Sequence, residues 1–164
     1  MLYGHDVIIS NPPYVFGDGT HETTRFLLYF LNRYAKGRSV IDAGCGTGIL
    51  SIFAIKCRAE SVTAIDVDND AVECTRANAE ANNASINIIK ADINIAELSD
   101  ADIVVANFAR WEALGNFPNI AKLTRRLLIT TWYKELPKDE LTNGFGIIDC
   151  IEGIDYDCYV LKKR

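Results

Sequence analysis

The stretch Ser39-Val-Ile-Asp-Ala-Gly-Cys-Gly-Thr-Gly-Ile-Leu50 decides how the rest of the chain is interpreted. Residues 39–41 predict a short buried strand that ends at Asp42, and the residues from Ile49 onward predict a helix. Glycines at every second position between them predict a tight strand-to-helix turn, in which no Cβ keeps a ligand from the backbone. The start of the helix would add free N–H groups and the positive end of a dipole.

The spacing of these glycines separates two classes of nucleotide site. A dinucleotide turn, G-x-G-x-x-G, would need a glycine in place of Ile49, so that pattern fails. The pattern present is Asp42-x-Gly44-x-Gly46-x-Gly48, which resembles the first motif of class I S-adenosylmethionine (AdoMet) methyltransferases. A carboxylate at the end of the strand suits the ammonium group of the methionine moiety, directly or through water. An ordinary glycine-rich loop is the alternative.

The length and composition are those of one globular domain, expected over residues 1–164. Hydrophobic residues make up 49% of the chain and charged residues 24%, which is ordinary for a soluble protein. The net charge of −5 argues against a broad nucleic-acid-binding face. A basic protein or a small molecule therefore fits better as substrate.

The five cysteines form no C-x-x-C pair and stand beside only two histidines, His5 and His21. No zinc-binding spacing is present, so no metal is expected. Reduced thiols in the cytosol are the plain interpretation. The sequence shows neither a signal pattern nor a long apolar span, so we expect a cytoplasmic protein that does not enter a membrane.

Strands and helices alternate along the chain. Strands are predicted over residues 39–41, 62–65, 86–90, 102–106, 126–131, 145–151 and 156–161, with a further short one over 6–10. Helices are predicted over residues 22–34, 49–58, 69–82, 113–122 and 138–141, with Thr20 as N-cap of the first and a break at Pro118 in the fourth. This alternation predicts a Rossmann-like, three-layer α/β sandwich around a seven-stranded, mostly parallel sheet. The last strand is expected to be antiparallel, after a turn at Gly153.

Polar side chains follow three of these strands at their carboxyl ends, where sheets of this kind bind ligands. Asp66 stands about 20 residues after the first glycine, where a carboxylate can bind both ribose hydroxyls. Asp92 can accept from an adenine amino group while the N–H of Ile93 meets a ring nitrogen. The amide of Asn107 can hold a substrate beside the methyl group. The alternatives are that Asp66 or Asp68 caps the following helix, that Asp92 is a turn residue and that Asn107 is a loop residue.

Four stretches together resemble the PrmA-type ribosomal protein methyltransferases. They are Phe16-Gly17-x-Gly19-Thr20-His21-x-Thr23-Thr24, Val40-Ile41-Asp42-x-Gly44-Cys45-Gly46-x-Gly48-Ile49-Leu50, Ile65-Asp66-Val67-Asp68 and Val104-Val105-Ala106-Asn107. The first is the specific one, because generic AdoMet enzymes lack it. The family methylates amino groups of a large-subunit ribosomal protein. The resemblance implies that Thr20 and His21 line the AdoMet pocket, that Asp66 holds the ribose and that Asn107 lies beside the transferred methyl group.

Three features depart from the family pattern. Family members carry a separate N-terminal substrate-recruiting domain that is not visible in this sequence, which bears on the ribosomal substrate more than on the chemistry. Asp18 and Glu22 stand where the family usually has Thr and Pro, so this loop is more acidic. Asn107 is followed by Phe108-Ala109-Arg110-Trp111 in place of an aliphatic continuation, which predicts a different acceptor pocket.

A second motif, Asn11-Pro12-Pro13-Tyr14, resembles the fourth-strand motif of methyltransferases that act on adenine or glutamine nitrogens. In those enzymes the Asn side chain and a Pro carbonyl accept from the target NH2 group, and the Tyr stacks on a flat substrate. The motif usually follows the glycine turn, whereas here it precedes it, as in permuted DNA methyltransferases. A Pro-Pro turn at the lip of the pocket is the alternative.

The sequence thus predicts an AdoMet-dependent N-methyltransferase acting on a lysine or N-terminal amino group of a protein, with a small-molecule amine as the other acceptor. Asn107 is the expected catalytic residue, and catalysis would consist mainly of positioning. Burial between aromatic walls would keep an acceptor lysine neutral. The expected substrate-binding residues are Asn11, Tyr14, Phe16, Phe108 and Trp111. The alternatives are methyl transfer to adenine in RNA or DNA through Asn11 to Tyr14, and a non-catalytic AdoMet-binding module.

Overall fold

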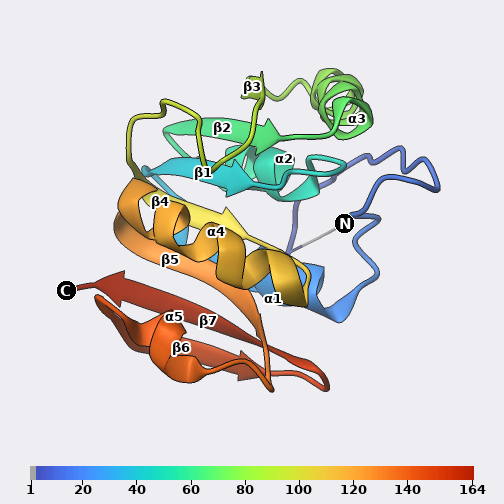
Figure 1. The fold of residues 1–164 in the computed structure, drawn as a ribbon. Coiled ribbons are helices and arrows are strands. Elements are labelled where there is room, and N and C mark those ends of the chain that lie inside the picture. Colours follow the sequence, from blue (N-terminus) through green and yellow to red (C-terminus); the bar gives the residue numbers. More distant parts are fainter. Residues whose placement is uncertain (1–2) are drawn as a thin grey trace.

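A computed structural model describes residues 3–164, apart from the side chains of residues 110 and 111. Within that part, seven strands form one sheet in the order β3-β2-β1-β4-β5-β7-β6 (Figure 1). The strands are β1 (Ser39–Ala43), β2 (Ser61–Asp66), β3 (Asn87–Lys90), β4 (Ala101–Ala106), β5 (Thr124–Tyr133), β6 (Phe145–Glu152) and β7 (Tyr156–Lys163). The helices are α1 (Glu22–Tyr34), α2 (Ile49–Lys56), α3 (Asn69–Ala81), α4 (Arg110–Leu123) and α5 (Lys138–Thr142).

The strand pairing confirms the predicted fold. β1 pairs in parallel with β2 and with β4, so that Val40 lies beside Val62 on one side and beside Ile103 on the other. β7 runs antiparallel to both β5 and β6, as expected for the last strand. The strand order reverses between β1 and β4, which is where ligands bind in open sheets of this kind.

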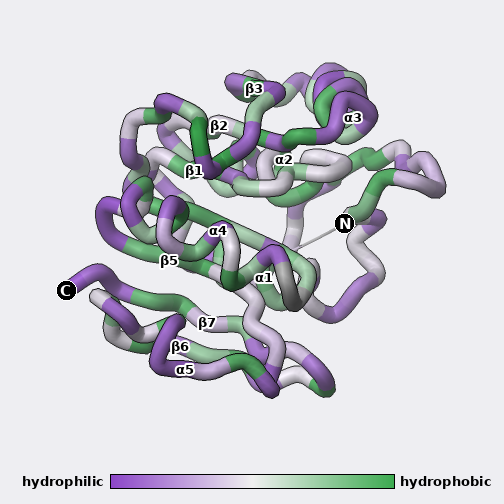
Figure 2. The backbone as a smooth tube through the Cα atoms, in the orientation of Figure 1, coloured by the Kyte–Doolittle hydropathy of each residue, from purple (hydrophilic) through white to green (hydrophobic). Residues whose placement is uncertain are grey.

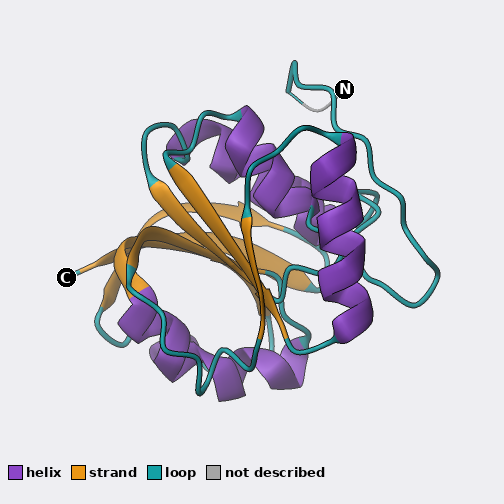
Figure 3. Cartoon of the chain, turned by 90° about the horizontal axis from the view of Figure 1, so that it is seen from above, coloured by secondary structure: helices purple, strands orange, loops and turns teal. Residues whose placement is uncertain are grey.

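Helices cover both faces of the sheet (Figure 3). α1 and α2 pack on one face against residues such as Val40 and Val105, and α4 and α5 pack on the other against Ile41 and Val104. Neighbouring residues of one strand point to opposite faces, and both faces are covered, so most residues of β1 and β4 are apolar. Figure 2 shows this as hydrophobic colour along the central strands, with hydrophilic stretches in α3 and the loops.

Residues 6–10 are not a strand, contrary to the prediction, because α3 holds them instead. The Asn82 side chain accepts from the Ile8 N–H at 2.9 Å and donates to the Ile8 carbonyl at 2.6 Å. Asn78 makes the same pair of bonds to Ser10, at 2.8 and 2.9 Å. Both amides are buried. They supply the partners that a neighbouring strand would otherwise give to this backbone.

The same face of α3 also holds the turn between β1 and α2. Asn78 donates to the carbonyl of Thr47 at 2.9 Å, and the Thr75 hydroxyl donates to the carbonyl of Gly46 at 2.9 Å. Residues 75, 78 and 82 share one side of the helix because they are three and four positions apart. This polar side therefore joins the N-terminal arm (residues 5–15) to the glycine turn.

α4 runs through Pro118, so the predicted break is wrong. Proline removes an N–H donor and crowds the preceding turn. Pro118 is exposed, however, while Ala113, Phe117 and Ile120 of the same helix are buried against the sheet. Packing of that apolar side outweighs the local penalty.

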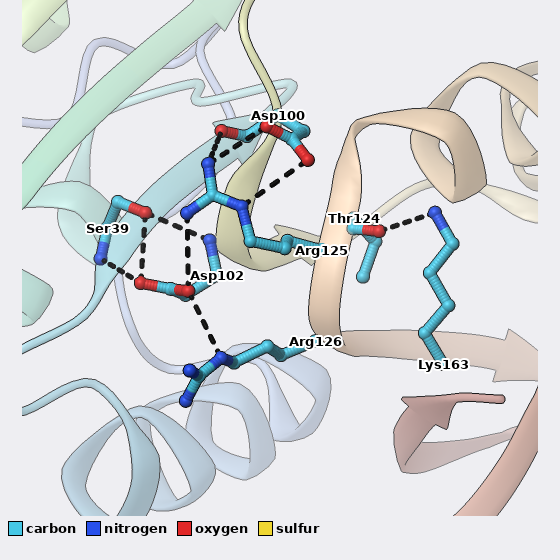
Figure 4. A network of polar contacts seen from close by, with 7 residues as sticks. All are labelled: Ser39, Asp100, Asp102, Thr124, Arg125, Arg126 and Lys163. Atoms are coloured by element: carbon cyan, nitrogen blue, oxygen red, sulfur yellow. Dashed lines mark hydrogen bonds and ion pairs between the residues drawn. The ribbon is translucent and has the colours of Figure 1, made fainter.

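A charged network joins the amino ends of the central strands, at the edge opposite the glycine turn (Figure 4). Asp102 accepts from the N–H and the hydroxyl of Ser39, both at 3.2 Å. Its other oxygen lies 3.4 Å from Arg125 and 3.4 Å from Arg126. Burial alone would raise the pKa of Asp102, but the Ser39 bonds and the two arginines outweigh it and lower the pKa. The network ties β1, β4 and β5 together away from the end that carries the predicted site.

Among the described residues, no helix combines the length and apolarity needed to cross a membrane. The cysteines are all free thiols, and they are Cys45, Cys57, Cys74, Cys150 and Cys158.

Replacing Asn78 with Ala should lower the free energy of unfolding by about 2–3 kcal/mol, because Ser10 and the buried carbonyl of Thr47 lose their partners. Urea unfolding with an unchanged m-value measures the loss. The control is Glu80→Ala, an exposed position on the same helix, which should stay within about 0.5 kcal/mol of the unsubstituted chain. Equal losses in the two variants would contradict a role for Asn78 as the link between arm and turn.

Candidate functional site

A cavity of about 600 Å³ opens at the carboxyl ends of β1, β2 and β4, next to the point where the strand order reverses. Residues 14–17, the glycine turn and the first turns of α1, α3 and α4 contribute to its wall. The predicted site residues that line it are Tyr14, Phe16, His21, Gly44, Gly46, Asp66, Asp92, Ile93, Asn107 and Phe108. The fold thus gathers at one place residues that are widely separated in the sequence.

Four predicted site residues do not line this cavity: Asn11, Thr20, Asp42 and Gly48. Asn11 and Thr20 line a second cavity of about 430 Å³, which shares Tyr14 with the first. The side chain of Trp111 lies outside the described part of the chain.

The backbone N–H groups of the glycine turn are occupied by the protein itself. Those of Gly44 and Cys45 donate to a carbonyl of β2 at 2.9 and 3.1 Å, and that of Gly46 donates to the Asp66 carboxylate at 3.0 Å. The Thr47 N–H donates to a carbonyl of residues 14–17 at 3.0 Å. These four N–H groups are therefore not free to bind a phosphate. At the start of α2, where the sequence predicts free N–H groups, the N–H of Ser51 donates to Asp42 at 3.0 Å, and for Ile49 and Leu50 the expectation stays a prediction.

The three glycines are required by protein packing. Gly44, Gly46 and Gly48 have φ values of +74°, +54° and +79°, a region that side chains with a Cβ disfavour. A Cβ would meet the ring of Phe108 at Gly44, the carbonyl of Phe16 at Gly46 and an α3 side chain at Gly48. The space beside these glycines, where a ligand was expected to lie against the backbone, is thus filled by other residues of the chain.

Asp42 is fully buried beneath the turn. Its Oδ2 accepts from the N–H and the hydroxyl of Ser51, at 3.0 and 2.6 Å, and so caps the first turn of α2. Its Oδ1 has no hydrogen-bond partner. Burial raises the pKa of Asp42 to about 6, against the lowering effect of the Ser51 bonds. Its role toward an ammonium group stays a prediction.

Asp66 lies at the end of β2, on the cavity wall. Its two oxygens accept from the N–H groups of Gly46 and Asp68, each at 3.0 Å. Asp68, and not Asp66, caps α3, because its side chain accepts from the Asp70 N–H at 2.9 Å. A carboxylate offers about four acceptor sites, so Asp66 can still accept from hydroxyl groups in the cavity.

Asp92 and Ile93 follow β3 on the same wall. Asp92 accepts from the Asn94 N–H at 2.8 Å, as a turn residue does. The second oxygen is available for a donor in the cavity. The turn role and a ligand-binding role are therefore compatible in this residue.

The amide of Asn107 is held on two sides. Its Oδ1 accepts from the hydroxyl of Thr131 on β5 at 3.0 Å, and its Nδ2 donates to the hydroxyl of Thr24 on α1 at 3.3 Å. Asn107 itself is half-buried and lines the cavity. The amide group is thus fixed in orientation beside the space that a ligand would occupy.

The loop before α1 differs by one residue from the prediction. His21 is the N-cap of α1, since its Nδ1 accepts from the Thr23 N–H at 3.3 Å. The Thr20 N–H and hydroxyl bind the Asp18 carboxylate, at 2.8 and 2.7 Å, and these bonds lower the pKa of Asp18. The N-cap is therefore one residue later than predicted. The Phe16 ring packs edge-on against His21, with 5.7 Å between the ring centroids.

Comparisons with known proteins identify the family. Residues 4–111 match the family described as ribosomal protein L11 methyltransferase (PrmA). The chain belongs to the PrmA family. A ribosomal protein L11 methyltransferase of Acetivibrio thermocellus is 46% identical to it over 168 aligned residues, which cover 97% of this chain and 54% of the relative. This member of the PrmA family therefore spans about half the length of the curated relatives it matches.

Solved structures share the fold of this PrmA family member. A ribosomal protein L11 methylase from Lactobacillus delbrueckii subsp. bulgaricus has a TM-score of 0.83 at 26% identity, and covers 93% of this chain and 83% of its own. The magnesium protoporphyrin IX methyltransferase of Synechocystis PCC 6803, solved with bound SAM, has a TM-score of 0.70 at 20% identity, over 84% of this chain and 81% of its own. At that identity the second likeness is one of fold alone.

The structure adds wall residues to this PrmA site that the sequence did not indicate. Tyr156, the first residue of β7, lines the cavity. The turn between β6 and β7 is brought there by Glu22, whose carboxylate accepts from the Ile154 N–H at 3.2 Å. Thr24 belongs to the family stretch over residues 16–24, which runs into α1, so that stretch contained a signal for it. Thr131 holds Asn107 from outside the cavity, and no local pattern distinguishes it from Thr130, its neighbour in β5.

Replacing Asp42 with Asn should change how stability depends on pH. The Asp42 carboxyl has a pKa of about 6 in the folded chain against an ordinary 3.8. Its contribution to the free energy of unfolding is therefore fully present below pH 3.8 and is lost as the pH rises to about 6. The shift corresponds to about 3 kcal/mol. The variant should therefore gain up to that amount relative to the unsubstituted chain between those pH values.

Urea unfolding of both proteins across this pH range measures the difference. Asp70→Asn, an exposed position, is the control and should run parallel to the unsubstituted chain. Parallel curves for Asp42→Asn as well would show that the Asp42 pKa is not raised.

Proposed function

We propose that the chain is an AdoMet-dependent N-methyltransferase whose acceptor is an amine of a ribosomal protein, a lysine or an N-terminal amino group. The arrangement of the glycine turn, Asp66 and Asn107 around one cavity, in a chain of the PrmA family, is the observation that carries the proposal. The names of the curated relatives support the ribosomal acceptor.

The cavity fits AdoMet in size and in its polar groups. Its volume of about 600 Å³ falls within the range of about 300–1,000 Å³ that is usual for such sites. Asp66 would accept from the ribose hydroxyls, while Asp92 and the N–H of Ile93 would face the adenine. The buried Oδ1 of Asp42, which has no partner in the chain, is an acceptor that a cationic group or a bridging water can satisfy.

When bound, AdoMet supplies a methyl group that an amine nitrogen can attack. The contribution of the chain is to place and prepare that amine. The amide oxygen of Asn107 can accept one N–H of the amine and so aim its lone pair. Phe108 and Tyr156 line the same cavity, and their rings would lower the pKa of a lysine by excluding water, which keeps the nucleophile neutral. The proton then leaves to solvent, and no general base is needed.

The charge of the chain supports a basic acceptor. The net charge of −5 favours association with basic proteins. An acceptor on the ribosome would place the reaction in the cytoplasm, which is part of the proposal. Asn11 does not line the large cavity, and Asn107 follows β4 at the fourth-strand position. Methyl transfer to adenine through Asn11 to Tyr14 therefore gains no support from this geometry.

Tritium-labelled AdoMet and isolated ribosomal protein L11 test the proposal. The purified chain should label L11, and Asn107→Ala should lower the rate about tenfold or more because the amine loses its acceptor. The control is Asn87→Ala, which is exposed on β3. If AdoMet raises the melting temperature but L11 is not labelled, the proposed transfer reaction is contradicted and a binding module is favoured. If AdoMet does not raise the melting temperature, the cofactor assignment is contradicted.

Asp66→Ala should weaken AdoMet binding by about 1.5–3 kcal/mol, the range for hydrogen bonds to a charged group. Titration calorimetry measures the affinity, and urea unfolding measures stability in parallel because Asp66 also binds the Gly46 N–H. Asp70→Ala makes the same change of charge outside the cavity and should leave affinity unchanged. If Asp66→Ala loses stability but keeps its affinity, Asp66 only braces the turn.

A further inference from the structure

The Asn107 amide can be held in either of two orientations, which differ by exchanging oxygen and nitrogen. An amide has two acceptor lone pairs on oxygen and two N–H donors on nitrogen. An acceptor at the wall suits an incoming amine, because an amide N–H would instead donate to the nitrogen lone pair that must attack. The amide can serve such an amine only while its neighbours hold it in place.

Thr131 is placed to hold the amide from the neighbouring strand. β4 and β5 are parallel and pair Ala106 with Thr130, so Thr131 stands beside Asn107 where β4 ends. The Thr131 hydroxyl donates to Asn107 Oδ1 at 3.0 Å. Thr131 is only 1% exposed and does not line the cavity. Any effect it has on a bound molecule must therefore pass through Asn107.

Thr24 completes the hold from the other side. Its hydroxyl accepts from Asn107 Nδ2 at 3.3 Å, and Thr24 is likewise 1% exposed. With one lone pair of Oδ1 taken by Thr131 and one N–H of Nδ2 taken by Thr24, one acceptor and one donor site of the amide remain. β5 and α1 thus hold the Asn107 side chain, which follows β4, from two directions.

We infer that Thr131 is the positioning residue that holds the Asn107 amide in place at the cavity wall, where the free lone pair of Oδ1 can accept from an amine. This inference rests on the proposed function. It assigns to β5 a part in recognising the acceptor, although no β5 residue lines the cavity.

The adjacent residue, Thr130, gives a matched control. Thr130 is also buried, at 5% exposure, but its hydroxyl donates to the Thr131 carbonyl at 3.1 Å and has no bond to Asn107. Successive side chains of a strand point to opposite faces, so the two hydroxyls lie on different sides of the sheet. Val has the shape of Thr and suits a strand, so Thr131→Val and Thr130→Val each remove one hydroxyl with little change in packing.

The first readout does not depend on activity. In the ¹⁵N-labelled chain of 164 residues, the side-chain NH2 resonances of Asn107 are assigned by their absence from Asn107→Ala. These resonances should report an ordered Asn107 NH2 group in the unsubstituted chain, in Thr130→Val and in Thr131→Ser. They should report a mobile NH2 group in Thr131→Val. Unchanged order in Thr131→Val would overturn the inference, whether or not the chain transfers methyl groups.

The second readout is steady-state transfer from AdoMet to ribosomal protein L11. Thr131→Val should lower kcat about fivefold to tenfold, as expected for one hydrogen bond, with AdoMet affinity by calorimetry within about twofold of the unsubstituted chain. Thr131→Ser should restore kcat, and Thr130→Val should leave it unchanged. Equal losses in Thr130→Val and Thr131→Val would overturn the inference. Failure of the unsubstituted chain to label L11 would instead count against the proposed function, and the resonance test would stand alone.

Discussion

The glycine turn between β1 and α2 is tied by hydrogen bonds to segments from across the chain, and the cavity depends on those ties. Asp66 at the end of β2 accepts from Gly46, residues 14–17 accept from Thr47, and Asn78 of α3 donates back to Thr47. A turn with positive φ at alternate residues has no regular ladder to satisfy its N–H groups. It therefore keeps its shape only where other elements supply partners, and two of these partners, Phe16 and Asp66, also line the cavity.

Acidic side chains gather on the side of the cavity that is formed by the ends of β1, β2 and β3. Asp66 and Asp92 line it, and Asp42 lies buried under the turn. Burial is the main cause of the raised pKa of Asp42, and the nearby charge of Asp66 adds to it. Such a cluster disfavours phosphate and favours a cation. The electrostatics therefore agree with a sulfonium cofactor better than with a dinucleotide, and the occupied N–H groups of the turn lead to the same choice.

The opposite side of the cavity is assembled differently. The β6–β7 turn docks on the carboxylate of Glu22, and this brings Tyr156 to the wall. Glu22 is one of the positions where the loop departs from the family pattern, and the structure gives it a bracing role at the site. The side proposed for the acceptor therefore combines α1, β4 and β7, whereas the side proposed for the cofactor is built from β1, β2 and their following turns.

The sequence by itself determined the order of strands and helices, the antiparallel last strand and the chemical character of the turn. Those features follow from periodicity and from glycine spacing, which act over a few neighbouring residues. Only the tertiary structure decided that residues 6–10 rest on α3, that α4 passes through Pro118, that Asp42 caps α2 and that Thr131 holds Asn107. These contacts join residues whose proximity depends on which strands become neighbours and on where side chains are buried. No local pattern contains that information, because the partners of each buried polar group are chosen by the packing of the whole chain.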